Sequence, residues 1–144
     1  MSVAVWDGTT LACDRGASDG PTIWEVNKML YYGNYVIVGV GPVADVGRLI
    51  DWYLTGANPD HFPYSASAML LVVRDGERKL YQYDHSATPR IYEDTKVAFG
   101  SGKDFAFGGL AAGATAEQAV QIACRFSTSC GHGVDKYDPM MQIS

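Results

Sequence analysis

The sequence predicts an α+β fold in which two β-sheets pack together and helices cover their outer faces. Asp-Gly pairs at positions 7–8 and 75–76 each separate two apolar runs, which is a strong signal for a β-hairpin. Apolar residues recur at helical spacing in segments 43–54 and 116–126. Strand pairs that alternate with helices in this way are typical of two sheets with helices outside.

Each element in the first half of the chain follows from a local pattern. We expect both residues of the 7–8 turn to have positive φ, and the returning strand to end at Asp14. Polar residues and a glycine indicate a loop, whereas a β-branched run indicates a buried strand. The elements expected in order are strands 2–6 and 9–13, a loop at 15–19, a short extended or turn segment at 22–28, and a strand at 35–40.

The second half begins with a helix and ends with a strand. Pro42 suits the first turn of a helix that runs to about Leu54, and Pro, Asn and Ser residues indicate a loop over 56–67. Thr115 and Gln118 fit a capping box for a helix that ends near Phe126. The other elements expected in order are strands 68–73, 79–83, 90–92 and 96–99, a helix at 105–112, and a strand at 133–137.

Length and composition exclude several classes of protein. The 144 residues suffice for one domain with a sizeable core, which we expect to span residues 1–144. A net charge of −5 argues against nucleic acid as the main partner, and no apolar run approaches the ~20 residues that span a bilayer. The beginning of the chain does not resemble a signal peptide. Three cysteines without a CxxC pair indicate reduced thiols, so we expect a cytoplasmic protein.

Four motifs, in the same order along the chain, resemble those of proteasome β-subunits. The first, at 8–18, is a glycine and an apolar strand followed by Ala-x-Asp and Ala-Ser, and the second, at 36–45, is a strand and a glycine followed by Ala-Asp. The third, at 97–110, is a strand that ends in Gly-Ser-Gly and is followed by a helix. The fourth, at 115–135, is a helix followed by Cys-Gly and Val-Asp. On these motifs the chain is similar to the proteasome/HslV-like N-terminal nucleophile hydrolases, and most of all to the short versions found in bacteria and phages.

The resemblance implies a four-layer αββα sandwich in which the Pro-rich segment 56–67 leaves the second helix reduced or missing. It implies a peptidase or amide hydrolase that acts on peptides or proteins, needs no cofactor or metal, and forms a ring. An ATPase regulator is compatible with this hypothesis, whereas nucleic acid and membranes are not expected as partners. The expected location is the cytoplasm of a bacterium or of a phage-infected cell. The aromatic residues expected to be exposed for ring contacts are Tyr31, Tyr32, Trp52 and Tyr53.

Three side chains are candidate catalytic residues under this resemblance: Asp14, Lys28 and Ser101. The lysine would support a hydroxyl nucleophile electrostatically, the aspartate would keep the lysine charged and oriented, and the serine would bond the terminal amine. A backbone N–H near Gly41 would meet the oxyanion. Each side chain also has an ordinary structural interpretation: Asp14 as the cap of a turn, Lys28 as a solvated surface lysine, and Ser101 as the cap of a helix.

Ser2 is the candidate nucleophile, because removal of Met1 would give it a free amine that can act as base for its own hydroxyl. An ungapped comparison with short relatives that begin Met-Thr-Thr-Ile-Ala instead aligns Met1 with the nucleophile. Gly8-Thr9 also resembles the cleavage junction of proteasome precursors, although a cut there would delete the first strand. The sequence leaves these alternatives open.

Departures from the family pattern favour a second hypothesis. Ser127 and Cys130 stand in the support positions where the family has an aspartate and a serine or threonine, and His132 replaces a glycine. Cys130 is also compatible with a small buried residue of no chemical role. The three histidines lack the spacing of metal ligands. The alternative function is a non-catalytic, proteasome-like structural or assembly protein, for example phage-encoded, that has lost the nucleophile.

Overall fold

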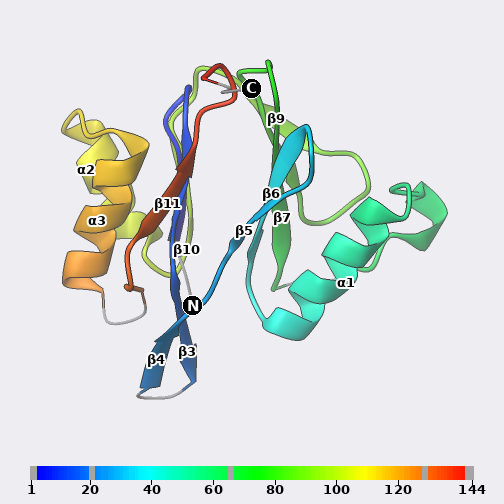
Figure 1. The fold of residues 1–144 in the computed structure, drawn as a ribbon, viewed down its shortest axis with the longest axis horizontal. Helices are drawn as coiled ribbons and strands as arrows, with labels where there is room; N and C mark the ends of the chain where they lie inside the picture. The colour runs from blue at the N-terminus through cyan, green and yellow to red at the C-terminus, as the bar shows by residue number, and fades with distance from the viewer. Residues whose placement is uncertain (1–2, 20–21, 65–66, 128–129, 142–144) are drawn as a thin grey trace.

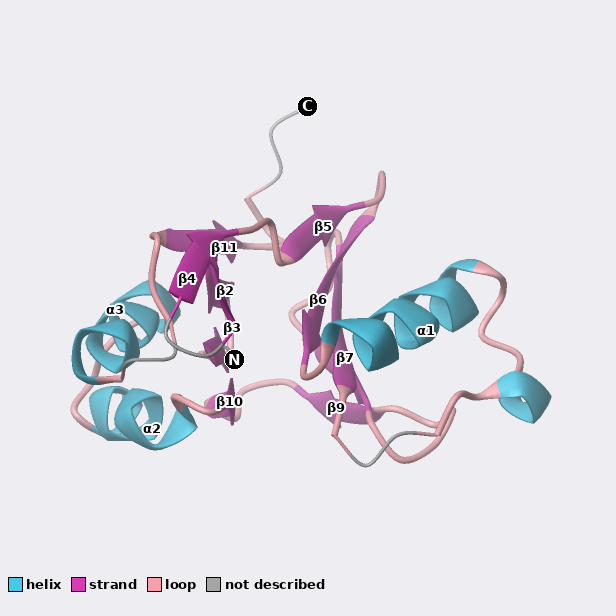
Figure 2. Ribbon diagram, turned by 90° about the horizontal axis from the view of Figure 1, so that it is seen from below, coloured by secondary structure: helices cyan, strands magenta, loops and turns pink. Residues whose placement is uncertain are grey.

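The computed structural model describes residues 3–19, 22–64, 67–127 and 130–141, and it has four layers (Figure 1). Two antiparallel sheets face each other in the middle. Helices α2 (Lys103–Ala111) and α3 (Ala116–Phe126) cover the outer face of one sheet, and α1 (Val43–Leu54) covers the outer face of the other (Figure 2). The predicted arrangement of two sheets between outer helices is confirmed.

The first sheet has β1 and β2 at its centre. Its strand order is β10 (Val97–Gly100), β1 (Val3–Trp6), β2 (Leu11–Asp14), β11 (Val134–Tyr137). Val3 and Val5 pack toward α2 and α3, whereas Ala4 and Trp6 pack toward the second sheet. Because both faces of β1 are covered, all four of its residues are buried, and the strand forms an unbroken apolar run in the sequence.

The turn between β1 and β2 is wider than the sequence predicts. Trp6 pairs with Leu11, so residues 7–10 form the turn and the returning strand does not begin at Thr9. Gly8 has a φ of 96°, but Asp7 is not in the positive-φ region, so that part of the prediction is wrong. The Asp7 carboxylate accepts hydrogen bonds from the N–H groups of Thr9 and Thr10, both at 2.9 Å. These bonds stabilise the wider turn, in which glycine alone takes the left-handed conformation.

The second sheet is a five-stranded meander. Its order is β5 (Met29–Tyr31), β6 (Tyr35–Val40), β7 (Met69–Arg74), β8 (Leu80–Tyr83), β9 (Arg90–Tyr92). The predicted hairpin around positions 75–76 is confirmed, with Val73 opposite Leu80 and Gly76 at a φ of 78°. The side chains of this sheet that point inward meet those of the first sheet in the central core.

Two short strands, β3 and β5, were missed by the sequence patterns, and a third, β4, lies in the segment 22–28 that was expected to be extended or a turn. Segment 15–19 was expected to be a loop, but residues Gly16–Asp19 form β3, which pairs with β4 (Thr22–Glu25) as a separate two-stranded ribbon. Strand β5 pairs Met29 with Val38 at the edge of the second sheet. These strands are short and lack clear apolar alternation, so backbone pairing with a neighbour decides their conformation.

The helices agree with the expected boundaries within two residues at their beginnings. The capping box of α3 is present, since Gln118 N donates to Thr115 Oγ1 at 3.2 Å and Thr115 N donates to Gln118 Oε1 at 3.0 Å. Between α1 and β7, the helical structure in the described residues is a single 3₁₀ turn, Pro59–His61. The second helix is therefore reduced, as expected.

One of the aromatic residues expected on the surface is buried instead. Trp52 is 5% exposed because α1 turns it into the core between this helix and the second sheet, where it packs edge-on against Phe62 and Tyr83. The expected exposure of Trp52 is therefore wrong, whereas Tyr31 is 62% exposed. None of the helices in the described part of the chain has both the length and the apolar character needed to cross a membrane.

Candidate active site

Asp14 is the fully buried last residue of β2, and four donors surround its carboxylate. Oδ1 accepts from Val3 N at 3.1 Å and from Lys28 Nζ at 2.7 Å. Oδ2 accepts from Gly16 N at 3.0 Å and from Gly131 N at 3.3 Å. A buried carboxylate is costly unless it is paired and hydrogen-bonded, and this one is both. Asp14 therefore joins the beginning of β1, the beginning of β3 and the segment before β11.

Lys28 points into the protein rather than into bulk solvent. It lies between β4 and β5, and its side chain is 11% exposed. The ammonium group meets the Asp14 carboxylate as an ion pair at 2.7 Å. The strands β3 and β4 return the chain from Asp14 to Lys28, so this ribbon brings the two residues together. The pair places a fixed positive charge close to the first residues of β1.

Ser101 and Gly41 line the same pocket, which has a volume of about 400 Å³ and lies where the ends of the two sheets meet. Ser101 follows β10 and Gly41 follows β6, so the pocket joins residues that are 60 positions apart. Gly41 has a φ of 126°, and a Cβ atom there would lie 2.5 Å from the carbonyl oxygen of Ser67. Only glycine therefore fits at this position without movement of the backbone. The pocket is also lined by Val40, Pro42, Met69 and Lys103.

The register of the first sheet relates this pocket to the beginning of the chain. Val3 pairs with Gly100, the residue before Ser101, and Val3 N donates to Asp14. The start of β1 therefore lies between the Ser101 end of β10 and the carboxylate that holds Lys28. Ser2, the candidate nucleophile, lies outside the described residues, so its role stays a prediction.

Comparison with solved structures identifies the fold. BPH from Thiobacillus denitrificans matches with a TM-score of 0.71 and 16% identity over 99% of this chain and 100% of that one. BPH in complex with epoxomicin matches with a TM-score of 0.67 and 15% identity, covering 95% of this chain and 97% of that one. Eukaryotic HslV from Trypanosoma brucei matches with a TM-score of 0.64 and 20% identity, covering 94% and 97%. The chain has the same fold as these HslV-like structures.

This finding confirms, at the level of the fold, the resemblance that the sequence motifs indicate. At the level of sequence, no protein-family model and no curated protein matches the chain. The four motifs are short and separated, and the three solved structures share only 15–20% of their residues with the chain. The HslV-like fold is therefore visible in the arrangement of the elements far more clearly than in the residues.

Two of the predicted support residues lie in the segment between α3 and β11. Ser127 is the C-cap of α3, and its N–H donates to the carbonyl oxygen of Ala123 at 2.8 Å. His132 has a φ of 62°, a left-handed conformation that favours glycine, which is the residue expected there in the HslV-like pattern. Cys130 is 5% exposed, as a small buried residue would be.

Thr9, the alternative nucleophile, lies in the β1–β2 turn. Its hydroxyl donates to Asp7 Oδ1 at 2.9 Å, at the opposite end of β2 from Asp14. A cut before Thr9 would remove β1, the buried strand that pairs with both β10 and β2. The geometry therefore favours a site at the beginning of β1.

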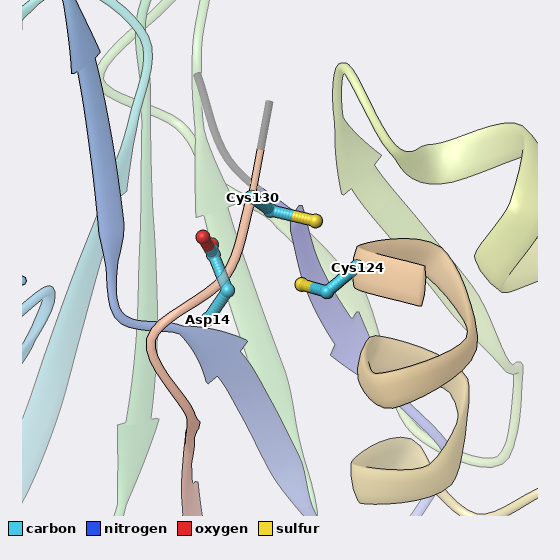
Figure 3. A group of neighbouring side chains, drawn as sticks. All are labelled: Asp14, Cys124 and Cys130. Atoms are coloured by element: carbon cyan, nitrogen blue, oxygen red, sulfur yellow. The ribbon is translucent and has the colours of Figure 1, made fainter. Parts of the chain in front are cut away.

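The sequence patterns missed one cluster beside the candidate site. Asp14, Cys124 and Cys130 each offer a ligand atom, and these atoms lie within 4.8 Å of one another (Figure 3). The two thiols share a hydrogen bond, which lowers the pKa of Cys130 and, together with burial, raises that of Cys124. Two thiols and a carboxylate could hold a soft divalent metal. However, the Asp14 oxygens already accept from Lys28 and three backbone N–H groups, which disfavours such a metal.

Proposed function

We propose that this protein is a proteasome/HslV-like N-terminal nucleophile peptidase or amide hydrolase. The observation that carries the proposal is the buried Asp14–Lys28 ion pair next to the beginning of β1. A lysine that is 11% exposed is costly to bury, and a positive charge at the start of the first strand is what an N-terminal nucleophile needs. The likeness to BPH solved in complex with epoxomicin supports the same proposal.

In the proposed mechanism, loss of Met1 leaves Ser2 as the first residue. The α-amine of Ser2 takes the proton from its hydroxyl, directly or through water, and the hydroxyl oxygen attacks the carbonyl carbon of a peptide. The charged Lys28 stabilises the developing alkoxide, and Asp14 keeps the lysine charged and in place. Ser101 hydrogen-bonds the amine, while a backbone N–H near Gly41 stabilises the oxyanion. The protonated α-amine gives its proton to the leaving nitrogen, the C–N bond breaks and the amine product leaves, and water then hydrolyses the ester.

The intact mass of the N-terminus and the activity of two hydroxyl variants test this proposal. We expect protein from its natural host to lack Met1, to hydrolyse small peptide amides or esters, and to be labelled by epoxomicin at Ser2. Ser2→Ala should lose both properties. The matched control Thr9→Val removes the exposed hydroxyl of the alternative nucleophile and should keep them. If Thr9→Val is inactive and Ser2→Ala is active, Ser2 is not the nucleophile.

A second candidate function is a non-catalytic structural or assembly protein. Two residues favour it: Ser127 where an aspartate would support the amine, and His132 in a glycine-type conformation. Under this hypothesis Met1 is retained, and Ser2→Ala changes neither folding nor assembly. Protein with a verified free Ser2 that neither hydrolyses peptides nor reacts with epoxomicin would establish this second function in place of the first.

A further inference from the structure

The two thiols beside Asp14 come from different elements and face each other. Cys124 lies in the last turn of α3, and Cys130 lies in the segment that leads into β11 (Figure 3). Their sulfur atoms lie within 4.8 Å of each other. A disulfide needs a separation of about 2 Å, so a movement of a few ångströms at the end of a helix would suffice.

The third cysteine is kept apart from this pair. Cys13 in β2 is fully buried in the core between the sheets, whereas Cys124 and Cys130 pack in the core between the first sheet and its helices. Burial raises the pKa of the Cys13 thiol to about 12, so that it stays protonated and unreactive. Cys124 is partly exposed, which gives a small oxidant access to the pair.

We propose that Cys124 and Cys130 are a redox pair that forms a reversible disulfide and thereby disturbs the support of Asp14. The oxidant is a peroxide. The Cys130 thiolate attacks one peroxide oxygen, so that an S–O bond forms, the O–O bond breaks, and hydroxide leaves and takes a proton. The Cys124 sulfur then attacks the sulfenic sulfur, the S–S bond forms, and the S–O oxygen leaves as water with the Cys124 proton. Two thiols lose two electrons, and hydrogen peroxide becomes two waters.

The pKa of Cys130 fits the first step. The hydrogen bond from Cys124 stabilises the Cys130 thiolate, although burial and the negative charge of Asp14 oppose ionisation. A peroxide that enters beside the partly exposed Cys124 is within reach of the Cys130 thiolate, since the two sulfur atoms lie within 4.8 Å of each other. Cys130 is therefore the thiol that peroxide oxidises, and Cys124 is the thiol that resolves the sulfenic acid.

The expected effect on the site passes through Gly131. Its N–H donates to Asp14 Oδ2 at 3.3 Å, and its carbonyl oxygen accepts from Arg15 N at 3.1 Å. Drawing Cys130 toward α3 moves its neighbour Gly131 away from Asp14. The carboxylate that orients Lys28 then loses one of its four donors. The rate of a reaction that depends on Lys28 should therefore fall, by about tenfold.

Peptide mapping tests the bond itself. The full-length protein is treated with hydrogen peroxide, unfolded, alkylated with iodoacetamide and digested with trypsin, which cuts after Arg125 between the two cysteines. We expect one linked pair of peptides that has lost two hydrogen atoms, an alkylated Cys13, and full reversal by dithiothreitol.

Cys124→Ser should leave Cys130 as a sulfenic acid that dimedone traps. The control Cys13→Ala should form the bond normally. Absence of the linked peptides would overturn the proposal, as would protection of both thiols by bound Zn²⁺.

Two further readouts separate this proposal from the proposed function. Hydrogen exchange at the Gly131 amide should accelerate after oxidation and recover after reduction; unchanged exchange with the bond formed would overturn the effect on the site. The loss of peptide hydrolysis on oxidation rests on the proposed function. If the reduced protein is also inactive while the bond forms and Gly131 exchange accelerates, the peptidase proposal fails and the redox pair stands.

Discussion

Asp14 and Lys28 are the residues on which both the folding and the proposed chemistry depend most directly. The carboxylate is fully buried and collects donors from β1, β3, Lys28 and the segment before β11. Each contact alone is modest, but together they fix the position of the only charged pair in the described residues in which one member is wholly buried.

Lys28→Met should therefore cost more stability than any surface charge. The variant keeps an unbranched stem but leaves the Asp14 carboxylate without its counter-charge, so we expect the free energy of unfolding to fall by about 3 kcal/mol. The control Lys136→Met breaks an exposed pair with Glu117 at 3.2 Å and should cost about 0.5 kcal/mol or less. Urea unfolding measures both. Equal losses would show that the buried pair contributes no more than the exposed one.

The β1–β2 turn shows how one side chain connects elements. Asp7 Oδ1 holds the turn, and Asp7 Oδ2 accepts from Ala116 N at 2.8 Å, the first residue of α3. Burial raises the pKa of Asp7, but hydrogen bonds from Ala116, Thr9 and Thr10 outweigh it and hold the pKa below its usual range. The turn and the amino end of the helix are thus stabilised by the same ionised carboxylate.

Asp7→Asn should destabilise the protein in a pH-dependent way. The amide nitrogen cannot accept from Ala116 N, so we expect a loss of about 1–2 kcal/mol at neutral pH. Because the folded-state pKa of Asp7 is lowered, its contribution is present above pH about 4 and is lost as the pH falls through the folded-state pKa. Thermal unfolding from pH 7 to pH 2.5 should show the wild type approaching the variant. The exposed Asp51→Asn serves as control; a gap that widens in acid would contradict this explanation.

Gly41 tests whether the pocket depends on a close backbone approach. Gly41→Ala adds a Cβ at a φ of 126° and within 2.5 Å of the Ser67 carbonyl oxygen. Gly76→Ala adds a Cβ at a φ of 78° into open space, so it isolates the conformational cost of about 1 kcal/mol. We expect Gly41→Ala to lose at least about 1 kcal/mol more than Gly76→Ala in urea unfolding. Similar losses would mean that the loop at Ser67 moves freely.

The four-layer arrangement leaves apolar side chains on the outside of the molecule. Phe105 and Phe126 stack on the helical layer with ring centroids 5.9 Å apart, and they are 46% and 64% exposed. Tyr31 and Tyr64 are exposed at 62% and 76%. Aromatic residues of this kind are enriched at interfaces between protein chains, which fits the self-association into a ring that the family resemblance implies.

The mass in solution tests the ring. One chain has a mass of 15.6 kDa, and we expect light scattering at micromolar concentration to give a mass several times larger. Replacing Phe105 and Phe126 together by Ser should shift this mass toward that of one chain if the helical layer forms the contact. A monomeric wild type would contradict self-association, whereas a ring that survives the double substitution would place the contact elsewhere.

Elements with local signals could be predicted from the sequence without the structure. The long β-branched run indicated β6, the Asp-Gly turns indicated two hairpins, and the capping box marked the beginning of α3. These signals act over a few residues, so they survive in the sequence when overall identity to known structures is 15–20%. The motifs around Asp14 and Ser101 likewise indicated the fold, although only through resemblance to a family.

Features that depend on distant partners emerged only when the chain folded. Strands β3 and β5 are too short and irregular to be recognised without the strands that pair with them. Trp52 is buried because α1 packs on the second sheet, whose strands come from other parts of the chain. No motif in the sequence pairs Cys124 with Cys130, and they meet because the end of α3 and the segment before β11 converge on Asp14. Local sequence encodes conformation, whereas the contacts that create chemistry arise when separate elements bury their apolar faces together.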